Sequence, residues 1–499
     1  MKKAILLSAA FAVCLSAAAW AQTMGEKLLS QGDREFTNGN YKSAGDLYKE
    51  ARAASMEGGE ADLADKARVR IYLAERAIGS YPYTREDAKR MLAENFPDVS
   101  EAERDAWLNN GKADFLKTDN EKRYLEDFIK NIKFRDRSLT AKDAEMVGQE
   151  GMFLREYNDI IFKPAGDEFA GSRSEPYVNP VTFEVSASLT IARDKLPARG
   201  ILHIWVPLPV ATAAQDDVRI LSITPEEYVV TVPRTDGDLG IVYLEVPLEN
   251  LTEDLTISVE FAFRHYEQRF FVDPAKVGEY DKESALYKEY TRSYGNTAVT
   301  PAIKTLTEEI TKGEKNPYLA AKMIYDHVVD NVKYSVTPHA TLAAVGTPES
   351  VFVQENKFGD CGAQSCYFSA LCRAVGIPVR TTGGMQLCPA ETSTHFWAEF
   401  YLPNYGWIPV DTSIAQTVDY TAEPDDRKKI FKEYYFGSQD PYRFVMQKDI
   451  DVPLTPAPGE QIVMPMAIQF PVVVSKSFEN DPTEMVLEGW KIEINPAAE

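Results

Sequence analysis

Cysteine and histidine are both scarce in this chain. Five of each occur among 499 residues, and no two cysteines form a Cys-x-x-Cys pair. So few cysteines exclude a disulfide scaffold, and without such pairs a zinc site is not expected. We expect neither a metal nor an organic cofactor. A bridge between Cys372 and Cys388 stays open, whereas Cys366 is expected to be a buried free thiol.

Basic residues are also few relative to acidic ones. Lys and Arg number 54 against 76 Asp and Glu, which gives a formal net charge of −22. Nucleic acids and anionic lipid surfaces should repel a chain of this charge. We therefore expect no nucleic-acid partner, and solubility is the simplest use of the acidity.

Beyond its first residues, the sequence has no apolar run long enough to cross a bilayer. The start has the parts of an export signal, namely a basic Lys2-Lys3, a short apolar stretch and the small residues of Ala19-Trp20-Ala21. Residues 1–21 are therefore predicted to be a signal peptide. The mature protein is expected in the periplasm or outside the cell, with no integral membrane span. A membrane anchor fits less well, because the apolar stretch is short.

The length of the chain predicts several domains, and its composition, 44% hydrophobic, is that of a globular protein. Residues 22–165 are predicted to be helical, because apolar residues recur at helical spacing. One part has the small and aromatic residues of a tetratricopeptide-like helix pair: Leu28, Gly32, Gly39, Tyr41, Ala44, Tyr48 and Ala51. No clear second copy follows, so an ordinary helical hairpin explains the pattern equally well. A repeat would imply a protein partner bound through this region.

Period-two alternation replaces helical spacing in residues 180–268, after a linker rich in Gly, Ser and Pro from Ala165 to Pro180. Strands are expected at Val181–Ile191, Ile201–Leu208, Val218–Ile223, Tyr228–Val232, Ile241–Val246 and Leu255–Phe263. They predict an antiparallel β-sandwich with no chemistry of its own. Its His203 and His265 are expected to be structural.

Helical and strand signals are mixed in residues 280–445, which are predicted to form a third domain, followed by a C-terminal extension at 446–499. Asn316-Pro317 marks one helix start. A second helix is expected from Cys361 to Val375, where Gly376 and Pro378 end it. Strands are expected at Val379–Leu387, His395–Leu402 and Trp407–Thr412. The whole chain is thus assigned to the α+β class, with several domains.

Three residues of this third domain are the minimum set for acyl transfer through a thioester: Cys361, His395 and Asp411. Cys361 opens the expected helix, where unpaired N–H groups should lower the pKa of the thiol. His395 begins one strand and Asp411 ends the next, with only a turn-rich tetrad between the strands. If the strands pair, Asp411 can accept the second imidazole N–H and fix the tautomer.

Other polar groups near these residues are weaker candidates for a catalytic role. The backbone N–H of Cys361 could face the oxyanion of a tetrahedral intermediate, and Tyr334 is one candidate for the second donor. His339 lacks the local frame that His395 has. His327 lies on the apolar side of the first expected helix and is expected to be packed rather than catalytic.

The segment from about Ala320 to Arg443 resembles the transglutaminase-like superfamily, whose core is papain-like. The motifs that carry the resemblance are Ile324-Tyr325-Asp326-His327-Val328, Gly359-Asp360-Cys361, Ala370-Leu371-Cys372-Arg373-Ala374-Val375-Gly376-Ile377-Pro378, His395-Phe396-Trp397-Ala398-Glu399, Gly406-Trp407-Ile408-Pro409-Val410-Asp411 and Asp440-Pro441-Tyr442-Arg443. The resemblance implies Cys361 as nucleophile, His395 as base and Asp411 as the residue that orients the base. Ser365, Phe396 and Thr412 depart from common family residues without removing a catalytic group.

Bacterial members of this superfamily are often taken to be peptidases or amidases. The resemblance therefore implies an exported cysteine peptidase or amidase that cleaves a protein or peptide substrate through an acyl-enzyme. A protein-glutamine transglutaminase, in which an amine resolves the thioester, is the alternative, because the sequence does not show whether water or an amine enters the pocket. A non-catalytic binding or assembly protein is the third interpretation, because more than half of the chain carries no visible chemistry.

Overall fold

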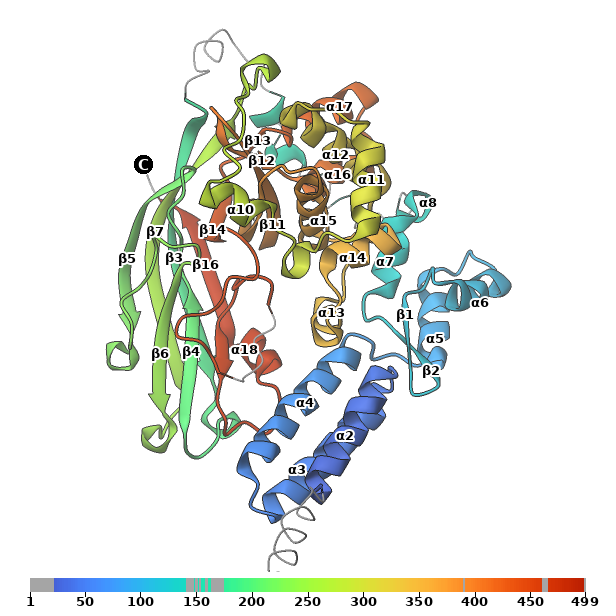
Figure 1. Ribbon diagram of the computed structural model, residues 1–499, viewed down its shortest axis with the longest axis vertical. Coiled ribbons are helices and arrows are strands. Elements are labelled where there is room, and N and C mark those ends of the chain that lie inside the picture. The colour runs from blue at the N-terminus through green and yellow to red at the C-terminus, as the bar shows by residue number, and fades with distance from the viewer. Residues whose placement is uncertain are drawn as a thin grey trace, which may run out of the picture.

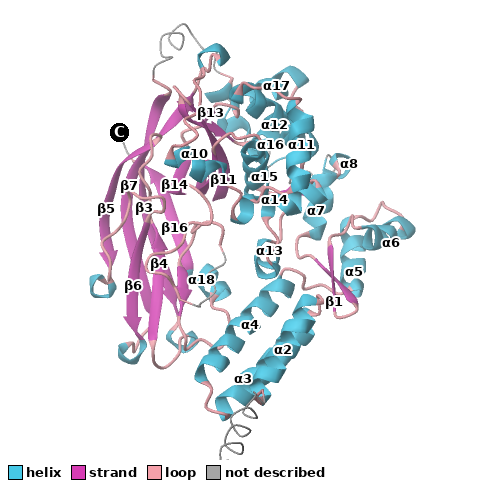
Figure 2. Ribbon diagram, in the orientation of Figure 1, coloured by secondary structure: helices cyan, strands magenta, loops and turns pink. Residues whose placement is uncertain are grey.

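The computed structural model describes residues 22–140, 148, 151, 154–157, 160–162, 175–388, 391–459 and 465–497. The predicted signal peptide and most of the predicted linker lie outside these residues. Strands gather on one side of the molecule and most helices on the other, with the N-terminal helices at one end (Figures 1 and 2). Among the described residues, no helix combines the length and hydropathy of a bilayer span.

The chain begins with three antiparallel helices, α2 (Met24–Thr37), α3 (Tyr41–Glu57) and α4 (Ala61–Gly79). Thr23 starts the first of them with a capping box, in which its side chain and that of Glu26 each accept a backbone N–H of the other residue. Close packing of α2 on α3 requires Gly32, because a Cβ there would lie 2.5 Å from the Tyr48 ring. Of the residues that suggested a helix pair, Gly32 and Tyr48 thus lie at a helix–helix contact. Whether the pair is a tetratricopeptide-like repeat stays a prediction.

The remainder of the N-terminal region is not wholly helical, contrary to the expectation for residues 22–165. Its helices are α5 (Arg85–Asn95), α6 (Glu101–Asn110), α7 (Phe128–Arg135) and α8 (Arg137–Thr140). A two-stranded hairpin, β1 (Phe115–Thr118) and β2 (Glu121–Tyr124), lies between α6 and α7. Asp119 and Asn120 turn it with φ of 48° and 64°, which these two residue types tolerate. The Asp119 carboxylate also accepts the backbone N–H groups of Lys42 and Ser43, at 3.0 Å each, and so caps α3.

Two sheets pack face to face in the sandwich. The larger has the strands β3 (Tyr177–Ile191), β5 (Gln215–Thr224), β7 (Leu255–Arg269), β13 (Ser438–Gln439) and β16 (Trp490–Pro496), and the smaller has β4 (Ile201–Pro207), β6 (Ile241–Pro247) and β15 (Val472–Val474). Alternate residues of β3 and β7, such as Leu189 and Phe261, are buried between the sheets, as period-two patterning predicts. His265 on β7 is buried as well.

The prediction of a strand at Tyr228–Val232 is wrong. A 3₁₀ turn, η3 (Glu226–Tyr228), occupies its start, and only one bridge, from Val229 to Leu244, joins the rest to β6. Prolines on both sides, Pro225 and Pro233, limit the backbone donors available for a ladder. Other short 3₁₀ turns are η2 (Arg193–Lys195), η4 (Leu248–Asn250), η5 (Pro274–Lys276), η6 (Gly295–Thr297) and η7 (Val418–Tyr420).

The segment expected to be a C-terminal extension adds strands to the sandwich. Strand β16 pairs with β3 over seven residues, and β15 pairs with β4. The helix α18 (Thr483–Gly489) lies between these two strands in the sequence and packs against β3 and β15. Residues 446–499 therefore tie the last part of the chain to elements some 300 residues earlier.

The third domain is a four-stranded antiparallel sheet with helices packed against it. Its strands lie in the order β12 (Gly406–Val410), β11 (Glu391–Leu402), β10 (Val379–Cys388) and β14 (Arg443–Gln447). Its helices are α10 (Ala285–Thr291), α11 (Pro301–Thr311), α12 (Pro317–Asn331), α13 (His339–Val345), α14 (Glu349–Asn356), α15 (Cys361–Ala374), α16 (Thr412–Thr417) and α17 (Asp425–Tyr434). The three predicted strands form, with two differences in their bounds. Strand β11 begins at Glu391, so His395 lies inside the strand and not at its start. Strand β12 ends at Val410, and Thr412 begins α16.

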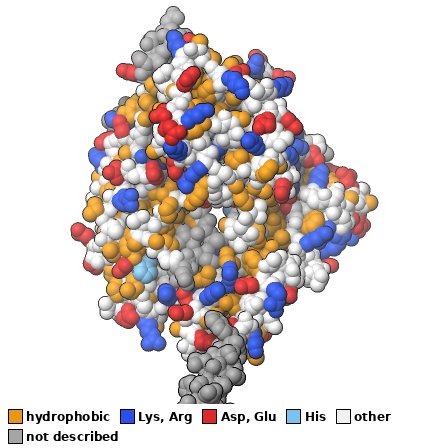
Figure 3. Space-filling model, viewed as in Figure 1, with side chains coloured by type: hydrophobic (Ala, Val, Ile, Leu, Met, Phe, Trp, Pro, Cys, Tyr) orange, Lys and Arg blue, Asp and Glu red, His pale blue; other side chains and the backbone are white. Residues whose placement is uncertain are grey.

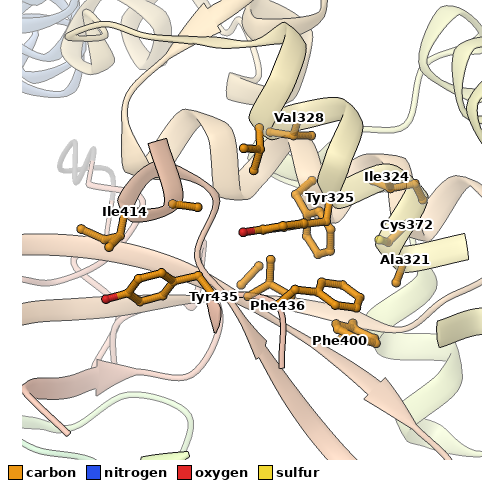
Figure 4. Close-up of a cluster of buried hydrophobic side chains, with 14 of the residues drawn as sticks. Ala321, Ile324, Tyr325, Val328, Cys372, Phe400, Ile414, Tyr435 and Phe436 are labelled. Atoms are coloured by element: carbon orange, nitrogen blue, oxygen red, sulfur yellow. The ribbon is translucent and has the colours of Figure 1, made fainter. Parts of the chain in front are cut away.

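The core of this domain lies where α12 meets α15 and the sheet. In the cluster that Figure 4 shows, the Tyr325 ring of α12 lies 5.2 Å from the Phe436 ring, and Val328 and Phe400 belong to the same cluster. All four side chains are at most 7% exposed. Burial of each such side chain contributes about 1.5–3 kcal/mol. This packing holds α12 and α15 against β11, and so fixes the start of α15 relative to the strand that carries His395.

Candidate active site

Cys361 is the first residue of α15, as the sequence predicts. Asp360 caps this helix, because its Oδ1 accepts the backbone N–H of Ala363 at 3.1 Å. The chain reaches the cap through a short parallel pair, β8 (Lys333–Tyr334) with β9 (Phe358–Gly359). Gly359 is needed here, since a Cβ on it would lie 2.8 Å from that of Ala363. The local sequence thus places a thiol at a rigid helix start.

The surroundings of the sulfur differ from the expectation in one respect. The thiol pKa of Cys361 was expected to be lowered by the helix N-terminus. Burial raises it instead, and the nearby carboxylates of Asp360 and Asp411 raise it further. The backbone N–H groups of Phe396 and Gly362 oppose that rise without overcoming it. The lowering of the thiol pKa by the helix N-terminus is outweighed, because the sulfur is desolvated and has acidic neighbours.

His395 and Asp411 meet at one edge of the sheet. Strands β11 and β12 pair antiparallel, with Ala398 opposite Val410. This pairing brings the two side chains together, and the imidazole Nε2–H donates to Asp411 Oδ2 at 2.8 Å. Both side chains are buried, at 5% and 1% exposure for the residues. The bond leaves Nδ1 as the proton acceptor of the ring when it is neutral.

Asp411 is held by three further donors. Its Oδ1 accepts the backbone N–H of Ile414 at 3.0 Å, which caps α16, and the Ser413 hydroxyl at 3.2 Å. Its Oδ2 also accepts Nη1 of Arg443 at 3.0 Å. Burial would raise the pKa of Asp411, but His395 and then Arg443 lower it, to about 2. Asp411 is therefore ionised throughout the neutral range.

Arg443 is the part of this arrangement that sequence reasoning did not assign. It is fully buried and also donates from Nη2 to Asp440 Oδ2 at 2.6 Å. Its guanidinium lies 5.5 Å from the centre of the Trp397 ring. The signal was present in the Asp440-Pro441-Tyr442-Arg443 motif, which the resemblance used without giving the residues a role.

Cys361 lies beside the strand of His395 without bonding its ring. Its side chain packs with Phe396, the residue after His395, and its sulfur lies near the Phe396 backbone N–H. Among the contacts of the described residues, no hydrogen bond joins the sulfur to the imidazole. The structure thus joins His395 to Asp411 directly and places Cys361 against the neighbouring peptide group. Catalytic contacts of this kind often tighten only when substrate binds.

Cys361 lines a cleft of about 950 Å³ between the third domain, the N-terminal helices and the C-terminal segment. From the third domain the cleft is lined by Asp360, Thr394, Phe396, Tyr334 and His339. Helix α4, residues 465–475 and the start of α18 line the rest of it, and Met466 and Ala467 pack in the same cluster as Cys361. Hydrophobic side chains flank the hollow near the centre of the face in Figure 3. An opening of this size accepts a short peptide segment.

Two expectations concern a tyrosine and a pair of cysteines. Tyr334 lines the same cleft as Cys361, with its ring edge against Phe134 at 4.9 Å, and its role as an oxyanion donor stays a prediction. The Cys372 thiol is buried and free, so the bridge to Cys388 that had been left open does not form. Within the described residues, no group of three or more His, Cys, Asp or Glu side chains could hold a metal ion.

Comparisons with known proteins find relatives of the third domain. Residues 304–412 match the model of the transglutaminase-like superfamily, and the chain thus carries a transglutaminase-like core. It is 25% identical over 253 residues to an uncharacterised protein of Haemophilus influenzae, covering 43% of this chain and 64% of that protein. It is 28% identical over 122 residues to a protein-glutamine gamma-glutamyltransferase of Pseudomonas aeruginosa, covering 22% of this chain and 18% of that protein. The chain therefore spans less than two thirds of either relative.

One solved structure is also similar to part of the chain. A candidate cysteine protease from Cytophaga hutchinsonii aligns with 64% of this chain and 92% of its own, at 14% identity and a TM-score of 0.39.

Proposed function

We propose that the protein is an exported cysteine hydrolase that cleaves peptide or amide bonds. One observation carries the proposal: a buried pair joins His395 of β11 to Asp411, the residue after β12, next to the helix start that presents Cys361 to a cleft. Thiol, imidazole and carboxylate in this order are the parts of a thioester mechanism. The transglutaminase-like core supports the same assignment.

In the proposed reaction, the Cys361 proton passes to His395 Nδ1 and the thiolate attacks the substrate carbonyl carbon. The tetrahedral intermediate collapses, the C–N bond breaks, and the imidazolium gives its proton to the leaving amine or ammonia. Water then loses a proton to His395 and attacks the thioester, which releases the carboxylic acid and the thiol. Asp411 holds the ring by its Nε2–H and stabilises the imidazolium in both halves.

The raised thiol pKa of Cys361 fits a nucleophile that is ionised by its base during the reaction. A thiol of this kind is mostly neutral in the free protein. Its reactivity should therefore depend on the His395 imidazole, and on any positive charge that compensates the carboxylates of Asp360 and Asp411.

Transamidation is the second candidate, favoured by the Pseudomonas aeruginosa relative, a protein-glutamine gamma-glutamyltransferase. It shares the first half of the reaction, and an amine replaces water in the second. A binding or assembly role through the N-terminal helices is the third, and it needs no thiol chemistry.

One assay separates the three candidates. Wild type and Cys361→Ala are incubated with a peptide library containing glutamine, with and without a primary amine, and the products are identified by mass spectrometry. Product without amine supports hydrolysis, and product only with amine supports transamidation. Equal results for the two proteins would exclude catalysis at Cys361. Export is tested separately, since the mature protein isolated from the periplasm or medium should begin at Gln22.

A further inference from the structure

A second group of charged side chains lies at the start of α15, on the far side of Asp360 from the helix. His339 Nε2 lies 2.7 Å from Asp360 Oδ2, and His339 Nδ1 lies 2.8 Å from Glu349 Oε1. An imidazole that donates to two carboxylates at once must carry both protons. We call this group the His339 cluster; it comprises Glu349, His339 and Asp360.

The His339 cluster is a rigid part of the cleft wall. The backbone N–H of Thr337 donates to Asp360 Oδ2 at 3.1 Å, and the Asp360 N–H donates to the Thr337 hydroxyl at 3.1 Å. Glu349 is only 2% exposed, whereas the His339 side chain is 38% exposed and lines the same cleft as Cys361. Figure 1 shows α13, which His339 begins, between α14 and α4. The ring is therefore both fixed and open to the cleft.

The charges around Cys361 show why the His339 imidazole matters for ionisation of the thiol. On the sulfur's own side lie the carboxylates of Asp360, which precedes it, and Asp411, with the imidazole of His395 on the neighbouring strand. The other carboxylate that faces His339 is Glu349, and Glu349 in turn lies near Asp451, which bonds Asn296. Among the described ion pairs, His339 is the partner of Asp360. Without it, the carboxylate next to the sulfur would stand uncompensated and disfavour a thiolate.

The electrostatics agree with this geometry. Burial would lower the pKa of His339, but Asp360 and Glu349 together raise it well above its ordinary value. In turn, His339 and the two backbone donors keep the pKa of Asp360 low despite burial. The ring thus stays cationic and the cap stays anionic through the neutral range.

We propose that His339 is a positioning residue for the Cys361 thiolate: its charged ring offsets Asp360 and holds that carboxylate in place as the cap of the nucleophile helix. This proposal deepens the proposed function, and it depends on that function in one point only, the use of the Cys361 thiolate as a nucleophile. His395 remains the base in this scheme. His339 acts through Asp360 on the free energy of ionising the sulfur.

The test measures the ionisation of the thiol without requiring turnover. The rate at which iodoacetamide alkylates Cys361 is followed by peptide mapping from pH 6 to 11 for the folded full chain, with Cys361→Ala as the blank. His339→Gln removes the cation. His339→Gln with Asp360→Asn removes both charges and keeps a good helix cap. His339→Lys keeps a cation, and His203→Gln, which replaces a half-exposed imidazole bonded to Tyr243, is the matched control.

We expect His339→Gln to raise the midpoint of the pH–rate curve by about one unit and to slow alkylation at pH 7 about tenfold. The double variant should return most of the way to wild type, and His339→Lys should stay near it. An unchanged midpoint in His339→Gln, or a double variant no closer to wild type than the single, would overturn the proposal. If His339→Gln melts early, the comparison of His339→Lys with the double variant decides, because both should stay near wild type. Failure of the proposed function would appear instead as equal library cleavage by wild type and Cys361→Ala, whatever the midpoints are.

Discussion

At the scale of single residues, the site is built from charged side chains that are buried and paired with one another. Asp411 Oδ2 accepts from both His395 and Arg443, and Arg443 also donates to Asp440. The sequence pointed to Cys361, His395 and Asp411 because a helix start and two neighbouring strands can be recognised along the chain. It placed His395 at the start of its strand, whereas the strand begins four residues earlier. It did not predict the role of Arg443, which lies 32 positions from Asp411 and reaches it only through the fold. The direction of the Cys361 pKa was missed for the same reason, since desolvation depends on what packs around the sulfur.

Removal of the buried cation should strongly destabilise the third domain. Arg443→Met leaves Asp411 and Asp440 buried without their counter-charge, so we expect a loss of about 3–5 kcal/mol in the free energy of unfolding. Urea unfolding followed by tryptophan fluorescence measures it. The matched control is Arg90→Met, which breaks an exposed pair with Asp87 and should cost less than about 1 kcal/mol. Equal losses for the two variants would contradict the assignment.

The low pKa of Asp411 should make stability depend on acid. Its folded pKa of about 2 lies below the ordinary value of 3.8, so the ionised form stabilises the fold above that value and the contribution is lost as pH falls toward 2. The shift corresponds to about 2 kcal/mol, of which about half should be gone at pH 3. Urea unfolding of wild type and Asp411→Asn at pH 5, 4 and 3 measures the difference. A difference independent of pH would show that Asp411 titrates normally in the fold.

At the scale of elements, local signals predicted most of what positions the site. Asn316 caps α12 by accepting the N–H groups of Tyr318 and Leu319, and the nucleophile helix starts at Cys361. The strands of residues 379–410 were found because they are bounded by turn residues. The hairpin at 115–124 was missed because its strands are four residues each, within a helical stretch. The strand expected at 228–232 failed because the flanking prolines outweighed its apolar composition.

The entry to the nucleophile helix should be intolerant of a methyl group. Gly359→Ala would place a Cβ 2.8 Å from the Ala363 Cβ and 3.0 Å from Val353 Cγ2, in a buried turn. We expect a loss of about 1–3 kcal/mol in stability and a lower alkylation rate at Cys361. Thermal melting and alkylation measure the two effects. Gly79→Ala, at a helical position with nothing within 4 Å, is the control and should be neutral or stabilising by up to about 1 kcal/mol. A stable Gly359→Ala with normal reactivity would show that the turn is not tight.

At the scale of the whole molecule, three regions meet at the cleft. The N-terminal helix α4 faces the nucleophile helix across it, and the C-terminal segment completes both its wall and the sandwich. The sequence predicted the three regions but not their contact, because few local signals describe pairs some 300 residues apart. Arg76 joins two of these regions: it bonds Asp481, at 2.9 Å from its Nη2, and the Thr483 hydroxyl at 2.7 Å.

Loss of this contact should loosen α4 from the cleft. Arg76→Ala removes a largely buried ion pair and leaves Asp481 without this partner. Hydrogen exchange in α4 and α18 should therefore become severalfold faster, while α15 stays protected. Hydrogen–deuterium exchange with mass spectrometry measures this. Lys49→Ala, which breaks an exposed pair with Glu75, serves as the control and should leave exchange unchanged. Identical exchange in the two variants would mean that other contacts hold α4.

The most direct measurement is the intact mass of the protein quenched in acid during turnover of the peptide library. A thioester intermediate predicts an acyl adduct on Cys361 that hydroxylamine removes, and that is absent from Cys361→Ala. Cleavage of the same library by Cys361→Ala at the wild-type rate, with no adduct on the wild-type thiol, would contradict nucleophilic catalysis at Cys361.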